Sequence, residues 1–176
     1  MKPKSKYSLQ CPIPKSDYAH VMLAHAGGGR LTKHLIDRMF YPLLDNAFLH
    51  QGHDGAMLPP IEGEIAMSTD SFVVDPIFFP GGDIGELAVN GTVNDLICCG
   101  AEPLYISLAF ILEEGFLLDE LWKVVQSIAI SAKAAGMPVT LRIANPVTTE
   151  SKQALAKGRR NASPASQKRE PPRCRP

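Results

Sequence analysis

Three aspartates, Asp54, Asp70 and Asp95, stand in apolar or glycine-rich surroundings rather than among other charges. A carboxylate in such surroundings usually needs a partner, and a hard cation such as Mg²⁺ bridging to phosphate groups is a partner that uses several carboxylates. The alternative for each aspartate is that it caps a turn or the start of a helix. Asp95 follows Asn94 inside an expected helix, where capping is difficult, so the pattern there favours a binding role.

A loop of consecutive glycines, Gly27, Gly28 and Gly29, precedes residues with helical apolar spacing. Glycines let backbone N–H groups approach an anion closely, and a helix N-terminus favours negative charge, so phosphate is the natural ligand. The loop is neither a Walker loop nor a GxGxxG motif after a clear strand, so a flexible hinge remains an equal alternative. His25 and Arg30 flank the loop and could either add charge to a phosphate or be solvated.

Asp83 is followed three residues later by Glu86, which is the spacing of a capping box, and the helix expected from there runs to about Cys99. For Asp83 the capping role is therefore favoured over a binding role. Cys98 and Cys99 are expected to be small core residues. The five histidines lack metal-ligand spacing and are expected at the surface.

The remaining elements follow from periodicity. Strands are expected at 56–58 and 65–74, and an apolar alternation predicts a further strand over 104–112. A helix is expected from Leu118 to about Gly136 and a last strand over 137–143. This order predicts a mixed α/β domain over residues 21–143, preceded by an N-terminal arm, residues 1–20.

Composition narrows the class of protein. The 176 residues are 45% hydrophobic, and the longest mostly apolar run, 104–112, is far shorter than the roughly 20 residues of a membrane-spanning helix. No signal peptide opens the chain, and the cysteines form no CxxC pair. We therefore expect a cytoplasmic protein of a reducing compartment that does not contact the membrane.

The formal net charge of zero conceals a reversal along the chain. Residues 1–140 carry 9 Lys and Arg against 16 Asp and Glu, whereas residues 141–176 carry 9 against 2 together with five prolines. The segment 144–176 is therefore expected to be a basic, proline-rich, disordered tail. It has no aromatic residue for base stacking, so nucleic-acid binding is not expected. Within it, Cys174 lies between two arginines, which favours the thiolate.

Four separated segments strongly resemble the hydrogenase maturation family HypE, over about residues 20–139. They are 23–31 (LAHAGGGRL), 68–74 (STDSFVV), 78–96 (FFPGGDIGELAVNGTVNDL) and 107–116 (SLAFILEEGF). HypE belongs to the superfamily of aminoimidazole ribonucleotide synthetase, selenophosphate synthetase and thiamin-monophosphate kinase, whose members activate an oxygen with ATP and Mg²⁺. The resemblance implies the N-terminal domain of that fold, in a homodimer whose strands form a shared β-barrel lined by nucleotide sites.

The resemblance also implies an activity and partners. HypE receives a carbamoyl group on a C-terminal cysteine from a HypF-type carbamoyltransferase, dehydrates the thiocarboxamide to a thiocyanate with ATP, and delivers cyanide to iron in the HypC–HypD complex. Phosphorylation of the amide oxygen makes it a leaving group, and Mg²⁺ neutralises charge on the phosphoryl group. The carried-over positions are the metal residues Asp54, Asp70 and Asp95 and the nucleotide residues Gly27, Gly28 and Gly29, with Asn94 and Asp83 as secondary nucleotide residues. The candidate catalytic thiol is Cys174, although its segment, 172–176 (PRCRP), is only superficially similar to the family's end, where cysteine is the last residue.

The chain departs from the family after about Val139. Family members continue there with a Gly-Asp-Thr-Lys segment and a second domain, whereas this chain continues with 140–146 (TLRIANP). We therefore expect a truncated HypE with an aberrant tail and impaired catalysis. The alternatives are a non-catalytic fragment that binds ATP and Mg²⁺ and dimerises, and another kinase or synthetase of the superfamily, of the thiamin-monophosphate kinase or selenophosphate synthetase type.

Overall fold

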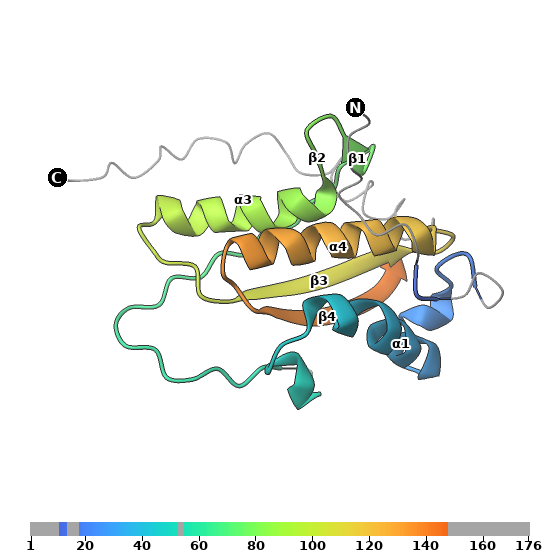
Figure 1. Ribbon diagram of the computed structural model, residues 1–176, viewed down its shortest axis with the longest axis horizontal. Helices are drawn as coiled ribbons and strands as arrows, with labels where there is room; N and C mark the ends of the chain where they lie inside the picture. The colour runs from blue at the N-terminus through green and yellow to red at the C-terminus, as the bar shows by residue number, and fades with distance from the viewer. Residues whose placement is uncertain (1–10, 14–17, 53–54, 148–176) are drawn as a thin grey trace, which may run out of the picture. The chain divides into compact units, whose positions relative to one another are not determined.

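The computed structural model describes residues 11–13, 18–52 and 55–147 (Figure 1). These belong to a compact unit, Met1–Pro146, apart from Val147, which falls in the second unit, Val147–Pro176. In chain order the elements are η1 (Leu23–His25), α1 (Arg30–Leu35), η2 (Ile36–Phe40), α2 (Tyr41–Leu44), η3 (Leu49–Gln51), β1 (Phe78–Phe79), β2 (Gly82–Asp83), α3 (Ile84–Cys98), β3 (Ile106–Glu113), α4 (Leu118–Ala134) and β4 (Val139–Val147).

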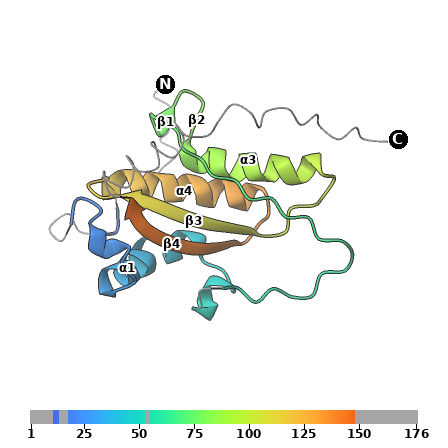
Figure 2. The ribbon, with the colours of Figure 1, turned by 180° about the vertical axis from the view of Figure 1, so that it is seen from behind.

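The centre of the unit is a β3–α4–β4 arrangement, which confirms the predicted mixed α/β class. Strands β3 and β4 lie side by side in one sheet and run in the same direction (Figures 1 and 2). The amide of Ile106 donates to the carbonyl of Pro138 at 3.3 Å and joins the starts of the two strands. A parallel pair needs a crossover, and α4 supplies it. Strand β4 extends to Val147, past residue 143, where the sequence pattern placed its end.

Helical residues from Arg30 to Leu44 form one run with an irregular middle. Elements α1 and α2 are joined by η2, a π-helical turn in which the amide of Tyr41 donates to the carbonyl of Ile36, five residues back. Proline cannot donate a backbone hydrogen bond and crowds the carbonyl four residues before it. The wider turn precedes Pro42, so the helix passes the proline and continues to Leu44.

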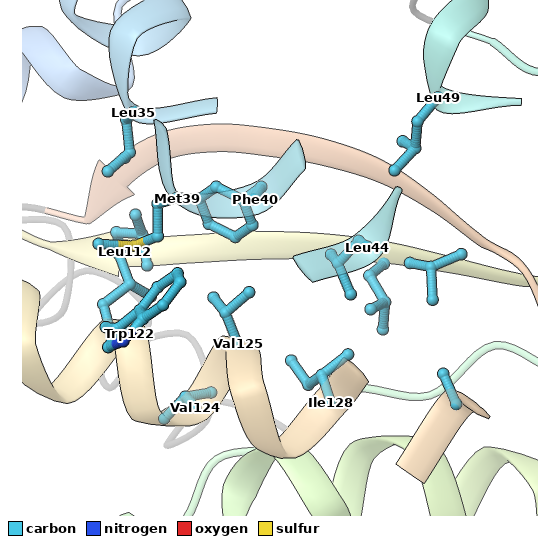
Figure 3. Packing of buried hydrophobic residues seen from close by; sticks show 14 of the residues in the cluster. Leu35, Met39, Phe40, Leu44, Leu49, Leu112, Trp122, Val124, Val125 and Ile128 are labelled. Carbon is cyan, nitrogen blue, oxygen red and sulfur yellow. The ribbon is translucent and has the colours of Figure 1, made fainter. Parts of the chain in front are cut away.

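One hydrophobic cluster unites these elements (Figure 3). Met39 and Phe40 of η2 are fully buried, as is Val125 of α4. The ring of Phe40 meets that of Phe110 on β3 edge-on, with centroids 5.1 Å apart. Burial of such side chains stabilises the fold by about 1.5–3 kcal/mol each. The core therefore fixes the run 30–44 against β3 and α4.

The predicted strands at 56–58 and 65–74 are wrong. In the described residues this stretch forms no β-ladder, and Met67 and Val73 are 87% and 97% exposed. A strand requires a partner for its backbone groups, and β-propensity alone does not supply one. The stretch instead runs as an extended chain (Figure 1); we call residues 65–74 the strap.

The chain before η1 pairs with the turn after β3. The amide of Val21 donates to the carbonyl of Phe116 at 2.7 Å, and that of Gly115 donates to the carbonyl of Val21 at 2.8 Å. An antiparallel bridge joins His20 to Leu117. These bonds fix where the chain starts toward the glycine loop. Within the described part of the chain, no helix is long and apolar enough to cross a membrane.

Candidate functional site

The glycine loop leads directly into α1, as the sequence pattern predicted. Gly29 is the residue before the helix and has no side chain with which to cap it. The amide of Gly28, a residue with a positive φ of 74°, donates to the hydroxyl of Thr32 at 3.0 Å. Within the described residues, no protein acceptor is recorded for the amides of Gly29, Arg30 and Leu31. Three consecutive donors are thus available to an anion at this turn.

The histidine before the loop is buried, which corrects the expectation of a surface residue. His25 is 1% exposed, its Nδ1 accepts the amide of Met22 at 2.9 Å, and the ring of Tyr18 meets it edge-on. Burial lowers the pKa of His25 below its usual 6.5, and the neighbouring His34 acts in the same direction. A neutral ring with Nδ1 as acceptor fits these contacts. His25 therefore anchors the chain before Gly27 and offers no positive charge to a phosphate.

Asp83 occupies the capping position that the spacing predicted. It is 1% exposed, and its Oδ1 accepts the amides of Gly85 and Glu86 at 2.8 and 3.1 Å. These are two of the donors left unsatisfied at the start of α3. Gly85 lies so close to α4 that an added Cβ would be 2.6 Å from the carbonyl oxygen of Val124. The start of α3 is thus held by both its cap and its neighbouring helix.

The strap contacts α3 at two points. The hydroxyl of Ser68 donates to Oδ2 of Asp95 at 3.1 Å, and a Cβ on Gly91 would lie 2.8 Å from the ring of Phe72. Asp70 lies between these two contacts along the chain, is exposed, and accepts the amide of Ser71 with its own Oδ1. The strap therefore brings the segment that carries Asp70 to the helix that carries Asp95.

Asp95 lies in the last turn of α3 and is exposed, as is Asn94 beside it. Among the described residues no three His, Cys, Asp or Glu side chains gather into a metal-binding group. Magnesium, however, is commonly held by one or two carboxylates together with the phosphates of its nucleotide. The oxygen atoms that the structure brings together here are those of Ser68 and Asp95. The other predicted metal residue, Asp54, lies outside the described residues.

The cysteines differ from expectation. Cys98 and Cys99 are exposed rather than part of the core. The buried residues of α3 are Gly85 and Val89, both in its first half, so its last turn extends past the packed face. Cys174, the predicted catalytic thiol, lies outside the described residues.

Sequence reasoning missed the supports of the site. Thr32 and Ser68 carry hydroxyls that bond to Gly28 and Asp95, and neither stood out in the sequence. Thr32 is in the third position of α1, where a side chain often reaches back to the residues before the helix. That spacing was the available clue for Thr32. The contact of Ser68 spans 27 residues, so local spacing could not reveal it.

Comparison with known proteins places this chain in a family. Residues 52–141 match the family described as AIR synthase related protein, N-terminal domain. The hydrogenase expression/formation protein HupE of Azotobacter chroococcum is 50% identical over 121 residues, which are 68% of this chain and 35% of that protein. The carbamoyl dehydratase HypE of Cupriavidus necator is 48% identical over 118 residues, 66% of this chain and 34% of that protein.

Solved structures of HypE proteins are also similar to this chain. A hydrogenase maturation protein HypE in complex with ATP has a TM-score of 0.69 and 47% identity, covering 72% of this chain and 38% of that one. The Escherichia coli HypE structure has a TM-score of 0.62 and 42% identity, covering 66% and 38%. The chain spans about a third of the length of the curated relatives it matches. It belongs to the family of AIR synthase related proteins, carries their N-terminal domain, and is similar in sequence and structure to the HypE hydrogenase maturation proteins.

Proposed function

We propose that this chain binds ATP with Mg²⁺ and serves hydrogenase maturation, in the dehydration of a cysteine S-carboxamide to a thiocyanate. The observation that carries the proposal is the likeness to a HypE structure solved with ATP, at 47% identity and a TM-score of 0.69. The amides of Gly29, Arg30 and Leu31, which have no acceptor among the described residues, support it because they suit a phosphate.

Each site residue has a role in this proposal. The glycine loop, Gly27 to Gly29, lets the backbone approach the phosphates; the amide of Gly29 is a donor to them, whereas that of Gly28 is bonded to Thr32. Asp54, Asp70 and Asp95 hold Mg²⁺. Asn94 assists from the same turn of α3 as Asp95. Asp83 acts indirectly, because its Oδ1 is already committed to the start of α3.

The proposed dehydration needs no reactant other than the cysteine S-carboxamide and ATP. The carboxamide oxygen attacks the γ-phosphoryl group of ATP, ADP leaves, and the C–O bond then breaks to release phosphate. The two amide protons pass to the released phosphate and to water, and the carbon–nitrogen bond becomes the triple bond of the thiocyanate. Magnesium supplies charge neutralisation on the phosphates when bound.

Calorimetric titration of ATP into the full chain, with and without Mg²⁺, tests the binding step. We expect Mg²⁺-dependent binding that Asp95→Asn weakens at least tenfold, because it removes a carboxylate from the ion. Asp37→Asn is the matched control, since it removes an exposed carboxylate whose described partner is Lys33. Equal binding by the two variants, or no binding by a folded chain, would contradict the proposal.

The group-transfer step concerns Cys174. We propose that its thiol accepts the carbamoyl group from a HypF-type carbamoyltransferase and that the cyanide later passes to a HypC–HypD complex. Cys174→Ala should abolish uptake of labelled carbamoyl, whereas Cys98→Ala, which removes an exposed thiol on α3, should retain it. Uptake that persists in Cys174→Ala would exclude this thiol.

We also propose that two copies of the chain pair, as the resemblance to the family implies, and we place the contact at the strap and the outer face of β3. Ile65, Met67 and Val73 on the strap and Ile111 on β3 are 67–97% exposed. A contiguous exposed apolar patch commonly marks an interface, and we propose that these side chains belong to one. Sedimentation analysis should find a dimer that Met67→Glu with Val73→Glu converts to a monomer; a wild-type monomer at all concentrations would refute the pairing.

A further inference from the structure

We propose that Thr32 is a positioning residue whose hydroxyl holds the glycine loop in the conformation that presents its amides. The inference rests on the proposed function only for the identity of the ligand, because the hydrogen bonds that carry it are internal to the chain. Thr32 touches neither nucleotide nor metal in this proposal and acts through Gly28.

The hydroxyl of Thr32 has two partners on the segment before the helix. It accepts the amide of Gly28 at 3.0 Å and lies 3.5 Å from the carbonyl of Ala24, to which it can donate. Donating to Ala24 directs the hydrogen away from Gly28 and leaves a lone pair for the Gly28 amide. Because Thr32 is 7% exposed, solvent has little access to replace these bonds.

The bond to Thr32 commits the amide of Gly28 and fixes the loop next to the available amides. Gly28 has a positive φ of 74°, a conformation that glycine adopts without strain. The amides that follow, those of Gly29, Arg30 and Leu31, have no acceptor in the described part of the protein, because they lie at the first turn of α1. Thr32 thus fixes the residue that directly precedes three consecutive donors for an anion.

A second anchor lies upstream of the loop. The buried ring of His25 accepts the amide of Met22, and the carbonyl of Met22 in turn accepts the amide of His25 at 2.9 Å. The ring of Tyr18 packs edge-on against it. The loop therefore starts from a rigid turn and ends on Thr32, so it is held at both ends, and loss of Thr32 frees only the downstream end.

Removing the hydroxyl should raise the mobility of the loop without unfolding the chain. Thr32→Val retains the shape of the side chain but cannot accept or donate, whereas Thr32→Ser retains the hydroxyl. One neutral hydrogen bond corresponds to about a fivefold change in an equilibrium. We expect the Gly28 amide to exchange with deuterium about fivefold faster in Thr32→Val and at nearly the wild-type rate in Thr32→Ser.

The affinity for Mg-ATP should change in parallel. Thr32→Val should raise the dissociation constant about fivefold, because the loop must then be ordered during binding. Thr32→Ser should restore the wild-type value. Thr92→Val is the matched control: it removes a threonine hydroxyl that donates to the carbonyl of Ala88 within α3, and it should leave both measurements unchanged.

The two measurements separate the inference from the proposed function. Unchanged exchange at Gly28 in Thr32→Val would overturn the inference, whatever the nucleotide affinity. Faster exchange with an unchanged dissociation constant would overturn the positioning role. If exchange at Gly28 is faster in Thr32→Val but the folded wild-type chain binds no Mg-ATP, the proposed ligand is refuted and the role of Thr32 in holding the loop is supported.

Discussion

Replacing Gly85 by alanine should loosen the packing of α3 against α4. A Cβ at this position would lie 2.6 Å from the carbonyl oxygen of Val124, 3.0 Å from Cγ1 of Ile128 and 3.1 Å from Oδ1 of Asp83. Carbon atoms in contact normally keep about 3.5 Å from their neighbours. The closest atom belongs to the backbone and cannot rotate away, so α3 itself must move.

The expected cost follows from two opposing effects. Overpacking costs about 1–3 kcal/mol, and a rigid backbone neighbour places this case at the upper end. Alanine gains at most about 1 kcal/mol over glycine from helix propensity. The net loss in the free energy of unfolding should therefore be about 2 kcal/mol, which lowers the melting temperature by about 4–8 °C for a domain of this size.

Urea denaturation followed by circular dichroism measures this change, and Asn90→Ala provides the control. Asn90 is an exposed residue of the same helix, so its replacement by alanine changes helix propensity without forcing a side chain against α4. It should be neutral or stabilising by up to about 0.5 kcal/mol. If Gly85→Ala were as stable as Asn90→Ala, the close approach of the two helices would not exist in solution.

Three further predictions follow from other contacts. Asn46→Asp should lower the free energy of unfolding by about 1–3 kcal/mol in denaturation experiments, because the Nδ2 group that donates to the carbonyls of Leu44 and Val139 is lost. The control Asn90→Asp, at an exposed position, should not lower the free energy of unfolding in this way. Gly91→Ala should make the strap more sensitive to protease by displacing Phe72, and in a Phe72→Ala background it should have no further effect. The free energy of unfolding should fall as the pH drops below 6.5, because His25 binds a proton in the unfolded chain but has a lowered pKa when it is buried in the folded protein. His25→Gln should flatten this dependence of the free energy of unfolding on pH. An unchanged dependence in the variant would show that His25 is not its source.

Local patterns were sufficient for the elements whose structure depends on their own neighbours. The alternation at Ile106, Leu108 and Leu112 predicted β3, and those three side chains are buried. The capping residue of α3 was recognised from its spacing to Glu86, and the glycine after α3, Gly100, has the positive φ expected at a helix end.

Long-range contacts explain what the sequence could not reveal. The strap has strand-like composition, but its described contacts are with α3 through Ser68 and Phe72, which lie 27 and 19 residues before their partners. The burial of His25 depends on Tyr18 and on the turn at Met22 rather than on its own polarity. The hydrogen bond of the Gly28 amide depends on the hydroxyl of Thr32, which lies four residues later in the chain.

The hydrogen bonds of Asn46 can form at different times while the chain is being synthesised. Its Oδ1 accepts the amides of Phe48 and Leu49, so these bonds can form as soon as this part of the chain leaves the ribosome. Its bond to the carbonyl of Val139 spans 93 residues and must wait until almost the whole domain has been made. Closing so long a loop is slow and entropically costly. The turn around Asn46 is therefore complete early, while its Nδ2 group waits for the acceptor that β4 supplies last, the carbonyl of Val139.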